Sequence, residues 1–394
     1  MGFGTLILLL LFVLFLFKCR NLKTAVSLPH KFYVYWVWCA IAYIVSYLPQ
    51  IKLSSFIPGG FDFFVFSVLL GFIISVFDLG AFKRHTRIVV IFAGVVLTLQ
   101  ELMFFTTGSR FSALIPFAEL TDGQPTAGLI ATQLSLDRSS SLFREPAHFA
   151  QYLLPLLCLD LFDERESGKL LSPYSYFMVA LIVLIRSGNG FIGLLILMIV
   201  KSFFFLKRAR AWKKIVTVIV FVPLAYYAIN AYVSTDVGSS VVERTSELKN
   251  DDSAASYIRV YRGFALYGEL PLLNKIIGIN DSRLLQIIPS TKVSFLFSGE
   301  EQSDLYMNGV QNVLIHQGLI GLLLFILMYV SFAKGKSLGG KMQIVLFLSL
   351  SLLGQTYLSN PMMYCTVLCI VANNKSYQSN ENRLLYKTPL SSRR

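Results

Sequence analysis

The sequence predicts an all-α polytopic integral membrane protein with about eleven transmembrane helices, or twelve. Hydrophobic residues make up 55% of the chain and charged residues only 14%, whereas soluble globular proteins carry about 25% charged residues. The mean hydropathy is +0.63. Apolar runs of about 17–22 residues recur, and this length crosses a hydrocarbon core about 30 Å thick. We therefore expect residues 1–394 to form a single transmembrane domain, with no separate soluble domain.

The net charge of +13 does not indicate a nucleic-acid partner. Lys and Arg residues gather between apolar runs, which is typical of the cytoplasmic loops of membrane proteins. The five cysteines lie outside the two long polar segments and show neither a metal-site spacing nor a disulfide framework. We therefore expect no metal, no cofactor and no nucleic acid.

The apolar runs give the expected helices in order. The first run, Gly2–Phe17, has no basic residue before it and no cleavage site after it, so we expect an uncleaved helix. The later helices are predicted at Phe32–Leu48, Gly60–Phe82, Ile88–Phe105, Pro146–Phe162, Pro173–Ile185, Phe191–Leu206, Ile215–Tyr232, Val310–Phe332, Met342–Leu358 and Met362–Asn373. Because basic residues are more frequent in alternate connections, the N-terminus is expected outside and the C-terminus in the cytoplasm.

Several connections between these helices are expected to be short. Ile51–Pro58 is predicted to be an outer turn, and Arg186–Gly190 an outer break between two short apolar segments. Lys83, Arg84 and Arg87 are predicted to form an inner loop.

Two polar segments are longer, and both are predicted on the non-cytoplasmic side. They are residues 106–145 and residues 234–309. An amphipathic helix is expected near residues 253–267, because Asp252 or Ser253 can cap its start and Gly268 with Pro271 can end it. We expect the two segments to form a polar chamber for an anionic substrate carried by a lipid.

The start of the predicted helix at Pro146 is the sharpest local signal. Proline suits the first helical position, and the helix N-terminus carries a partial positive charge. Arg144 precedes it, Glu145 lies at the cap and His148 follows. This pattern favours a phosphate site. The alternative is a capped helix whose charged side chains only anchor it at the membrane interface.

The helix near residues 253–267 is the second signal. Arg259 and Arg262 are three residues apart and share a helical face, with Tyr257 and Tyr261 interleaved. Arginine binds phosphate bidentately, and tyrosine rings can stack on sugars. Arg283 is a further candidate ligand farther along the segment. The alternative is an amphipathic helix that lies on the membrane surface.

The third signal lies at the start of the helix Val310–Phe332. Asn308, Asn312 and His316 recur every four residues and form a polar stripe on an apolar segment. His316 is expected about 9 Å inside the helix start. Polar residues at such depth are costly and often functional. Histidine also accepts a proton readily near neutral pH, so His316 is a candidate base, with Glu145 as the other.

Two further sets of residues are weaker candidates. Glu101 lies near the outer end of an apolar run and needs a partner, for which Arg110 or Arg186 are available. An acidic group, Glu300, Glu301 and Asp304, is more typical of a solvated loop than of a metal site.

Four short stretches give the chain a resemblance to a known family. They are Phe143–Ala150, Ser187–Phe191, Pro271–Ile279 and Asn312–Gly321. With the many apolar runs, these stretches resemble bacterial O-antigen and capsular polysaccharide polymerases of the Wzy type. Asn312–Gly321 is also similar to the related O-antigen ligases. The family more often has an N-terminus in the cytoplasm and twelve helices, which differs from the topology predicted above.

The resemblance implies a metal-independent glycosyltransferase at the periplasmic face of the bacterial inner membrane, with a fold similar to the C-type glycosyltransferases (GT-C). The implied substrate is an undecaprenyl-pyrophosphate-linked oligosaccharide in the membrane lipid, and a chain-length regulator protein is a further partner to consider. Arg144, Arg259 and Arg262 would neutralise the pyrophosphate, and His316 or Glu145 would deprotonate the acceptor hydroxyl. The alternatives are an O-antigen ligase that transfers glycan to lipid A core, and a lipid-linked oligosaccharide flippase or other transporter.

Overall fold

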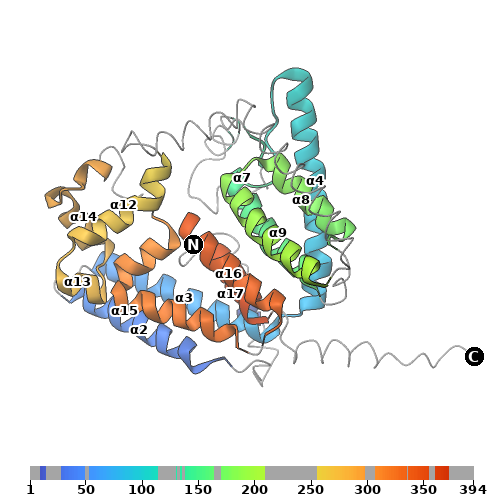
Figure 1. Ribbon diagram of the computed structural model, residues 1–394. Coiled ribbons are helices and arrows are strands. Elements are labelled where there is room, and N and C mark those ends of the chain that lie inside the picture. The colour runs from blue at the N-terminus through green and yellow to red at the C-terminus, as the bar shows by residue number, and fades with distance from the viewer. Residues whose placement is uncertain are drawn as a thin grey trace, which may run out of the picture.

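The computed structural model describes residues 9–14, 28–48, 53–113, 130, 134, 138–163, 170–208, 255–297, 307–334, 336–354 and 360–371. Every regular element within these ranges is helical (Figure 1). Four helical stretches are long and apolar enough to cross a membrane: Gly59–Val76, Leu79–Thr107, Gly188–Phe205 and Gly309–Phe332. Shorter apolar helices accompany them. By the length and composition of these helices, the chain is a multi-pass membrane protein.

The helices keep the order of the predicted apolar runs. They are α2 (His30–Tyr47), α3 (Leu53–Val76), α4 (Leu79–Thr107), α7 (Pro146–Leu161), α8 (Pro173–Ile185), α9 (Gly188–Arg208), α12 (Ala255–Glu269), α13 (Leu272–Ile277), α14 (Asp281–Ile287), α15 (Gly309–Phe332), α16 (Leu338–Leu353) and α17 (Asn360–Val371). Two 3₁₀ turns, η2 (Ile288–Ser290) and η3 (Ser294–Phe297), follow α14. The start and end of α8 match the prediction.

The prediction was wrong at the connection between α3 and α4. The predicted helix Gly60–Phe82 crosses a break at residues 77–78, because the Asp78 carboxylate accepts a hydrogen bond from the Ala81 N–H (3.0 Å) and caps α4. Lys83 and its basic neighbours therefore lie in the first turns of α4 and not in a loop. The single capping residue Asp78 therefore separates α3 from α4 within an apolar run that hydropathy alone predicts to be one helix.

Two other predicted elements differ or cannot be compared. α3 already begins at Leu53, so most of the predicted outer turn at residues 51–58 is helical. Of the predicted first helix only residues 9–14 are described, as helix, and the predicted helix Ile215–Tyr232 lies outside the described residues.

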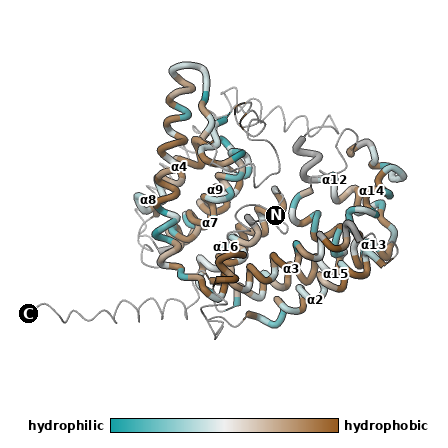
Figure 2. The backbone as a smooth tube through the Cα atoms, turned by 180° about the vertical axis from the view of Figure 1, so that it is seen from behind, coloured by the Kyte–Doolittle hydropathy of each residue, from teal (hydrophilic) through white to brown (hydrophobic). Residues whose placement is uncertain are grey.

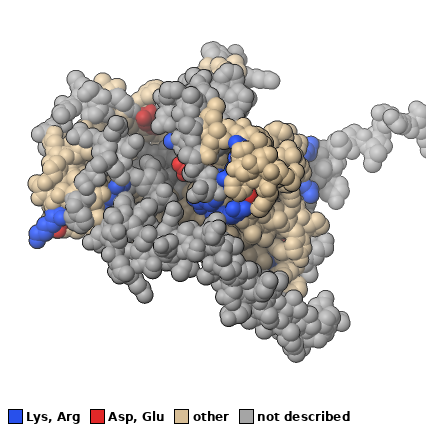
Figure 3. All heavy atoms as spheres, turned by 90° about the horizontal axis from the view of Figure 1, so that it is seen from above, with Lys and Arg blue, Asp and Glu red and all other residues tan. Residues whose placement is uncertain are grey.

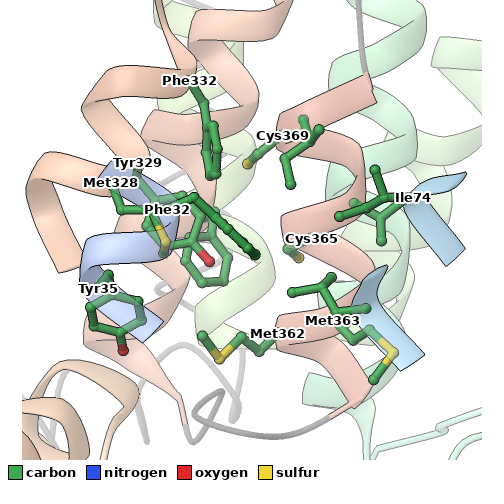
Figure 4. Packing of buried hydrophobic residues seen from close by; sticks show 14 of the residues in the cluster. Phe32, Tyr35, Ile74, Met328, Tyr329, Phe332, Met362, Met363, Cys365 and Cys369 are labelled. Atoms are coloured by element: carbon green, nitrogen blue, oxygen red, sulfur yellow. The ribbon is translucent and has the colours of Figure 1, made fainter. Parts of the chain in front are cut away.

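The described helices form two groups that α16 and α17 connect (Figure 1). One apolar core joins α2, α3, α15, α16 and α17 (Figure 4). Within it the Tyr329 ring stacks on Phe347 at 4.5 Å between centroids, and the Tyr329 hydroxyl is hydrogen-bonded to Thr366 (2.6 Å). The other core joins α4, α7, α8, α9 and α16. α3, α4 and α15 are apolar over most of their length, with polar residues in the first turns of α4 and α15 (Figure 2).

A third and smaller apolar core forms beside the start of α15. It is built from α12, α14, the two 3₁₀ turns and the start of α15, and it includes Leu266, Ile279, Leu284, Phe297 and Ile315. Because Ile315 belongs to α15, this core fixes the polar segment that precedes α15 onto the transmembrane bundle. The predicted helix near residues 253–267 is confirmed as α12.

Candidate functional site

The candidate site lies at the end of the bundle where α15 begins. The Gly309 N–H donates to the Gly354 carbonyl (2.8 Å), which ties the start of α15 to the end of α16. The Asn280 amide donates to the Ser46 carbonyl (2.5 Å) near the end of α2. Seen from above, basic side chains gather near the middle of the molecule with acidic side chains beside them (Figure 3).

Both ring nitrogens of His316 face residues between the end of α13 and the first residue of α14. Its Nδ1 lies 2.8 Å from the Ile279 carbonyl oxygen. A carbonyl oxygen only accepts, so Nδ1 carries the hydrogen, and Nε2 of the neutral ring offers a lone pair. Nε2 lies 3.4 Å from the Asp281 carboxylate. The Asp281 side chain is 72% exposed and that of His316 is 20% exposed. His316 therefore presents an oriented proton acceptor close to solvent.

Two glycines let the backbone of this segment approach α15. Gly278 has φ +104° and Gly318 has φ +68°, which are conformations that favour glycine. A Cβ on Gly318 would stand 2.1 Å from the Ile276 carbonyl oxygen, and one on Gly278 would stand 2.3 Å from the His316 carbonyl oxygen. We call Gly278–Asp281 together with Ile315–Gly318 the histidine corner.

Two backbone carbonyls before the break in α15 at Gly318 accept hydrogen bonds from other parts of the chain. The Ile279 N–H donates to the Ile315 carbonyl (2.9 Å), and the Trp38 indole N–H donates to the Gln317 carbonyl (3.0 Å). These bonds replace the helical bonds lost at the kink, so the break is a stable feature of the fold.

The other two residues of the predicted polar stripe serve the start of α15. Asn308 is the N-cap and forms a capping box with Gln311. The Asn312 amide donates to the Met307 carbonyl (3.0 Å) and the residue is buried. The stripe is thus divided, because only His316 faces the segment between α13 and α14.

Neighbouring residues of α12 have opposite surroundings. Arg262 is fully buried, with its guanidinium 4.8 Å from the centre of the Phe297 ring. Its neighbour Gly263 packs against Gln311, and a Cβ there would stand 2.7 Å from that side chain. Tyr261 is exposed. The burial of Arg262 places its side chain in the small core, whereas the sequence suggested a ligand of pyrophosphate.

The remaining predicted residues of this region lie on α12 and α14. Tyr257 and Arg259 belong to α12, and their side chains lie outside the described part of the chain. Arg283 lies on α14, where its backbone N–H donates to the Asn280 side chain that caps this helix (2.9 Å). Its side chain is partly exposed.

At the predicted phosphate site, the N-cap residue of α7 forms no side-chain capping hydrogen bond. Pro146 is the first helical residue, as expected, and Glu145 occupies the N-cap position without a side-chain capping bond. Glu145 is the other candidate base, and within the described residues it forms no ion pair. Arg144 is partly buried, and His148 is exposed.

The partners suggested for Glu101 are both confirmed. The Glu101 carboxylate is buried, 2.7 Å from Nη2 of Arg186 and 3.8 Å from Nε of Arg110. Arg138 donates to the Arg186 carbonyl (2.8 Å), and the Arg110 guanidinium lies 3.6 Å from the centre of the Phe104 ring. We call Glu101, Arg110, Arg138 and Arg186 the glutamate cluster. It joins the end of α4 to the turn between α8 and α9.

Two residues in or beside the glutamate cluster have left-handed backbone conformations, which residues other than glycine rarely adopt. Arg186 has φ +53° and Ser141 has φ +56°, where a glycine is more usual. The Ser141 N–H donates to the Gln100 side chain (2.8 Å), and its hydroxyl donates to the Ala93 carbonyl (2.6 Å). Gln100 and Ser141 were not predicted as part of this site. For Gln100 the available signal was its position beside Glu101 at the end of an apolar run.

The described residues include no group of three or more His, Cys, Asp or Glu side chains that could hold a metal ion. The acidic group Glu300, Glu301 and Asp304 lies outside the described residues. A scan against protein-family models finds no match for this chain, and a search of curated proteins finds no match either.

Proposed function

We propose that the protein polymerises undecaprenyl-pyrophosphate-linked oligosaccharide repeat units into O-antigen or capsular polysaccharide. The transfer would take place at the periplasmic face of the bacterial inner membrane. The observation that carries the proposal is the geometry of His316, a partly exposed histidine whose Nδ1–H is fixed by a carbonyl and whose Nε2 is available near solvent. A glycosyl transfer to a hydroxyl group needs a base in this position.

In the proposed reaction, Nε2 of His316 takes the proton of an acceptor hydroxyl on one lipid-linked repeat unit. The hydroxyl oxygen forms a bond to the anomeric carbon of the growing glycan on a second lipid. The bond between that carbon and the pyrophosphate oxygen breaks, so undecaprenyl pyrophosphate leaves with the electron pair. His316 then releases its proton to water. The 3.4 Å contact with Asp281 stabilises the imidazolium that forms in between.

The leaving pyrophosphate develops negative charge that arginines can neutralise. Arg144 beside the open cap of α7 and the partly exposed Arg283 on α14 are the described candidates for this contact. Because Arg262 is fully buried against Phe297, we assign it the support of α12 and not contact with the leaving group.

The position of the polar groups favours an enzyme over a transporter. Transporters of lipid or sugar substrates bind near the middle of the membrane, between broken helices. In this chain α15 is also broken, but the break at Gly318 lies in the first half of α15, and Glu101 lies near the end of α4, so both polar groups are nearer to helix ends than to the middle of a span.

The test uses purified protein in nanodiscs with undecaprenyl-pyrophosphate-linked repeat units and EDTA. We expect a ladder of glycans on the lipid carrier, and no ladder with H316Q. Transfer only after lipid A core is added would identify a ligase. Movement of labelled substrate across proteoliposomes without a glycan product would identify a transporter. Either of these last two results would overturn the proposal.

A further inference from the structure

The outward face of α13 is apolar although it belongs to a segment that the sequence assigns to a polar loop. Leu272 is 74% exposed and Leu273 is 64% exposed, and Ile276 on the same short helix is also exposed. The opposite face of α13 is used, since Asn274 is buried and the helix packs against α15 and α2. Two adjacent leucines facing water would leave a large apolar surface uncovered.

The depth of α13 along α15 follows from helix geometry. Gly318 touches the end of α13, because a Cβ on it would stand 2.1 Å from the Ile276 carbonyl oxygen. The fourteen residues between Gly318 and the end of α15 at Phe332 rise about 21 Å at 1.5 Å per residue. Lys334 and Lys336 follow Phe332 and mark the membrane border. A hydrocarbon core of about 30 Å therefore reaches roughly 9 Å beyond Gly318.

The backbone around α13 forms the hydrogen bonds that a segment at this depth in the membrane needs. Backbone outside long helices is stable within a membrane only where its polar groups bond to protein. The Gly278 N–H donates to the Asn274 carbonyl (2.8 Å), and the Ile279 N–H and carbonyl are bonded to Ile315 and His316. The turn between α12 and α13 is also tied by a hydrogen bond, since the Tyr267 hydroxyl donates to the Lys275 carbonyl (3.0 Å).

The apolar face of α13 continues onto the outward faces of the helices that support it. Leu319 and Leu323 on α15 are exposed, and Ile44 and Leu48 on α2 are exposed as well. α15 is long and apolar enough to span a membrane, so its outward face meets lipid. Because α13 packs against α15 and α2, we expect the exposed apolar side chains of these three helices to meet the same type of neighbour.

We propose that α13 is a re-entrant segment whose Leu272, Leu273 and Ile276 lie against the hydrocarbon of the leaflet next to the start of α15. The occupant of this face is the acyl chains of bilayer lipids. Asp281 follows α13 and is 72% exposed, and its partner His316 lies about 3 Å closer than Gly318 to the membrane border on that side. The proposal concerns the position of α13 and does not depend on the reaction proposed above.

The experiment measures the depth of single labelled cysteines in nanodiscs. The background variant is Cys19→Ser, since the other four cysteines are buried. L272C and L273C carry a bimane label, and its fluorescence is quenched either by brominated phospholipids or by iodide in the water. L323C on α15 is the matched lipid-facing control, and S290C at the exposed end of η2 is the matched water-facing control.

We expect labels at 272 and 273 to be quenched by brominated lipid about as strongly as the label at 323, and to be several-fold less sensitive to iodide than the label at 290. Quenching by iodide as strong as at 290 would place α13 in water and overturn the proposal. Protection from both quenchers would show that protein covers this face, which would overturn it too.

Discussion

The histidine corner and the glutamate cluster hold their key side chains by different means. In the histidine corner, backbone groups and two glycines orient a partly exposed imidazole, and among the described residues its charged partner is the exposed Asp281. In the glutamate cluster, a buried carboxylate is held by arginines, one of which adopts a strained backbone conformation. The two regions lie on different helix groups (Figure 1).

This difference indicates different tasks. A base must exchange its proton with substrate and water, so it needs orientation together with access. A buried ion pair lacks this access to substrate and water. Removing one of its partners is costly for stability, because the remaining charge stays buried without a counter-charge. We therefore expect changes in the glutamate cluster to act on stability, and changes to His316 to act on activity.

The largest expected effect is the loss of the close backbone contact in the histidine corner. G318A adds a Cβ that would stand 2.1 Å from the Ile276 carbonyl at a φ of +68°. Strain and overpacking together should lower the free energy of unfolding by about 5 kcal/mol. Thermal unfolding in detergent measures this. The control is G71A in α3, where a Cβ meets nothing within 4 Å and should change stability by less than about 1 kcal/mol. Equal melting of both variants would contradict the close contact.

The second effect concerns the glutamate cluster. E101A leaves the buried end of Arg186 without its carboxylate and should destabilise the protein by about 3 kcal/mol. E101Q keeps the shape of the side chain and should cost less. In a double-mutant cycle with R186A, the combined loss should fall short of the sum of the single losses. Strictly additive losses would mean that the two side chains do not interact.

The third effect tests the assignment of His316 as the base. H316Q should slow glycan elongation about a hundredfold, through kcat, while the melting temperature changes little. Single-turnover rates with lipid-linked repeat units measure it. H85Q, at an exposed position of α4, is the matched control and should elongate at the normal rate. An H316Q protein with normal turnover would exclude His316 as the base.

The smallest effect separates the histidine from its acidic neighbour. D281N keeps the shape of Asp281 and removes its charge, and the 72% exposure of this side chain means that solvent screens the pair. We expect the elongation rate to fall by less than about fivefold. A loss as large as that of H316Q would assign Asp281 a direct role in proton transfer.

Several features of the fold and the site were predictable because they depend on nearby residues. Pro146 fixed the start of α7, and Gly268 with Pro271 ended α12 close to the expected position. The pairing of Glu101 with Arg110 or Arg186 was also predictable, because a carboxylate in an apolar run requires a cation.

Other features were not predictable from patterns in the sequence. Arg262 looked like a surface ligand on an amphipathic helix, but the small core built from five elements encloses it. Asn312 looked like part of a polar stripe, yet its amide serves the Met307 carbonyl. In both cases the periodicity of the sequence left open what covers the side chain.

The sequence by itself determined the membrane class and most helix positions, because hydropathy, caps and prolines act over a few residues. Only the tertiary structure decided which polar groups meet. Ile279 reaches Ile315 and His316, and Asn280 reaches Ser46, across separations of tens to hundreds of residues. Such contacts depend on how helices pack and on glycines that permit close approach at Gly278 and Gly318, and no local pattern encodes that packing.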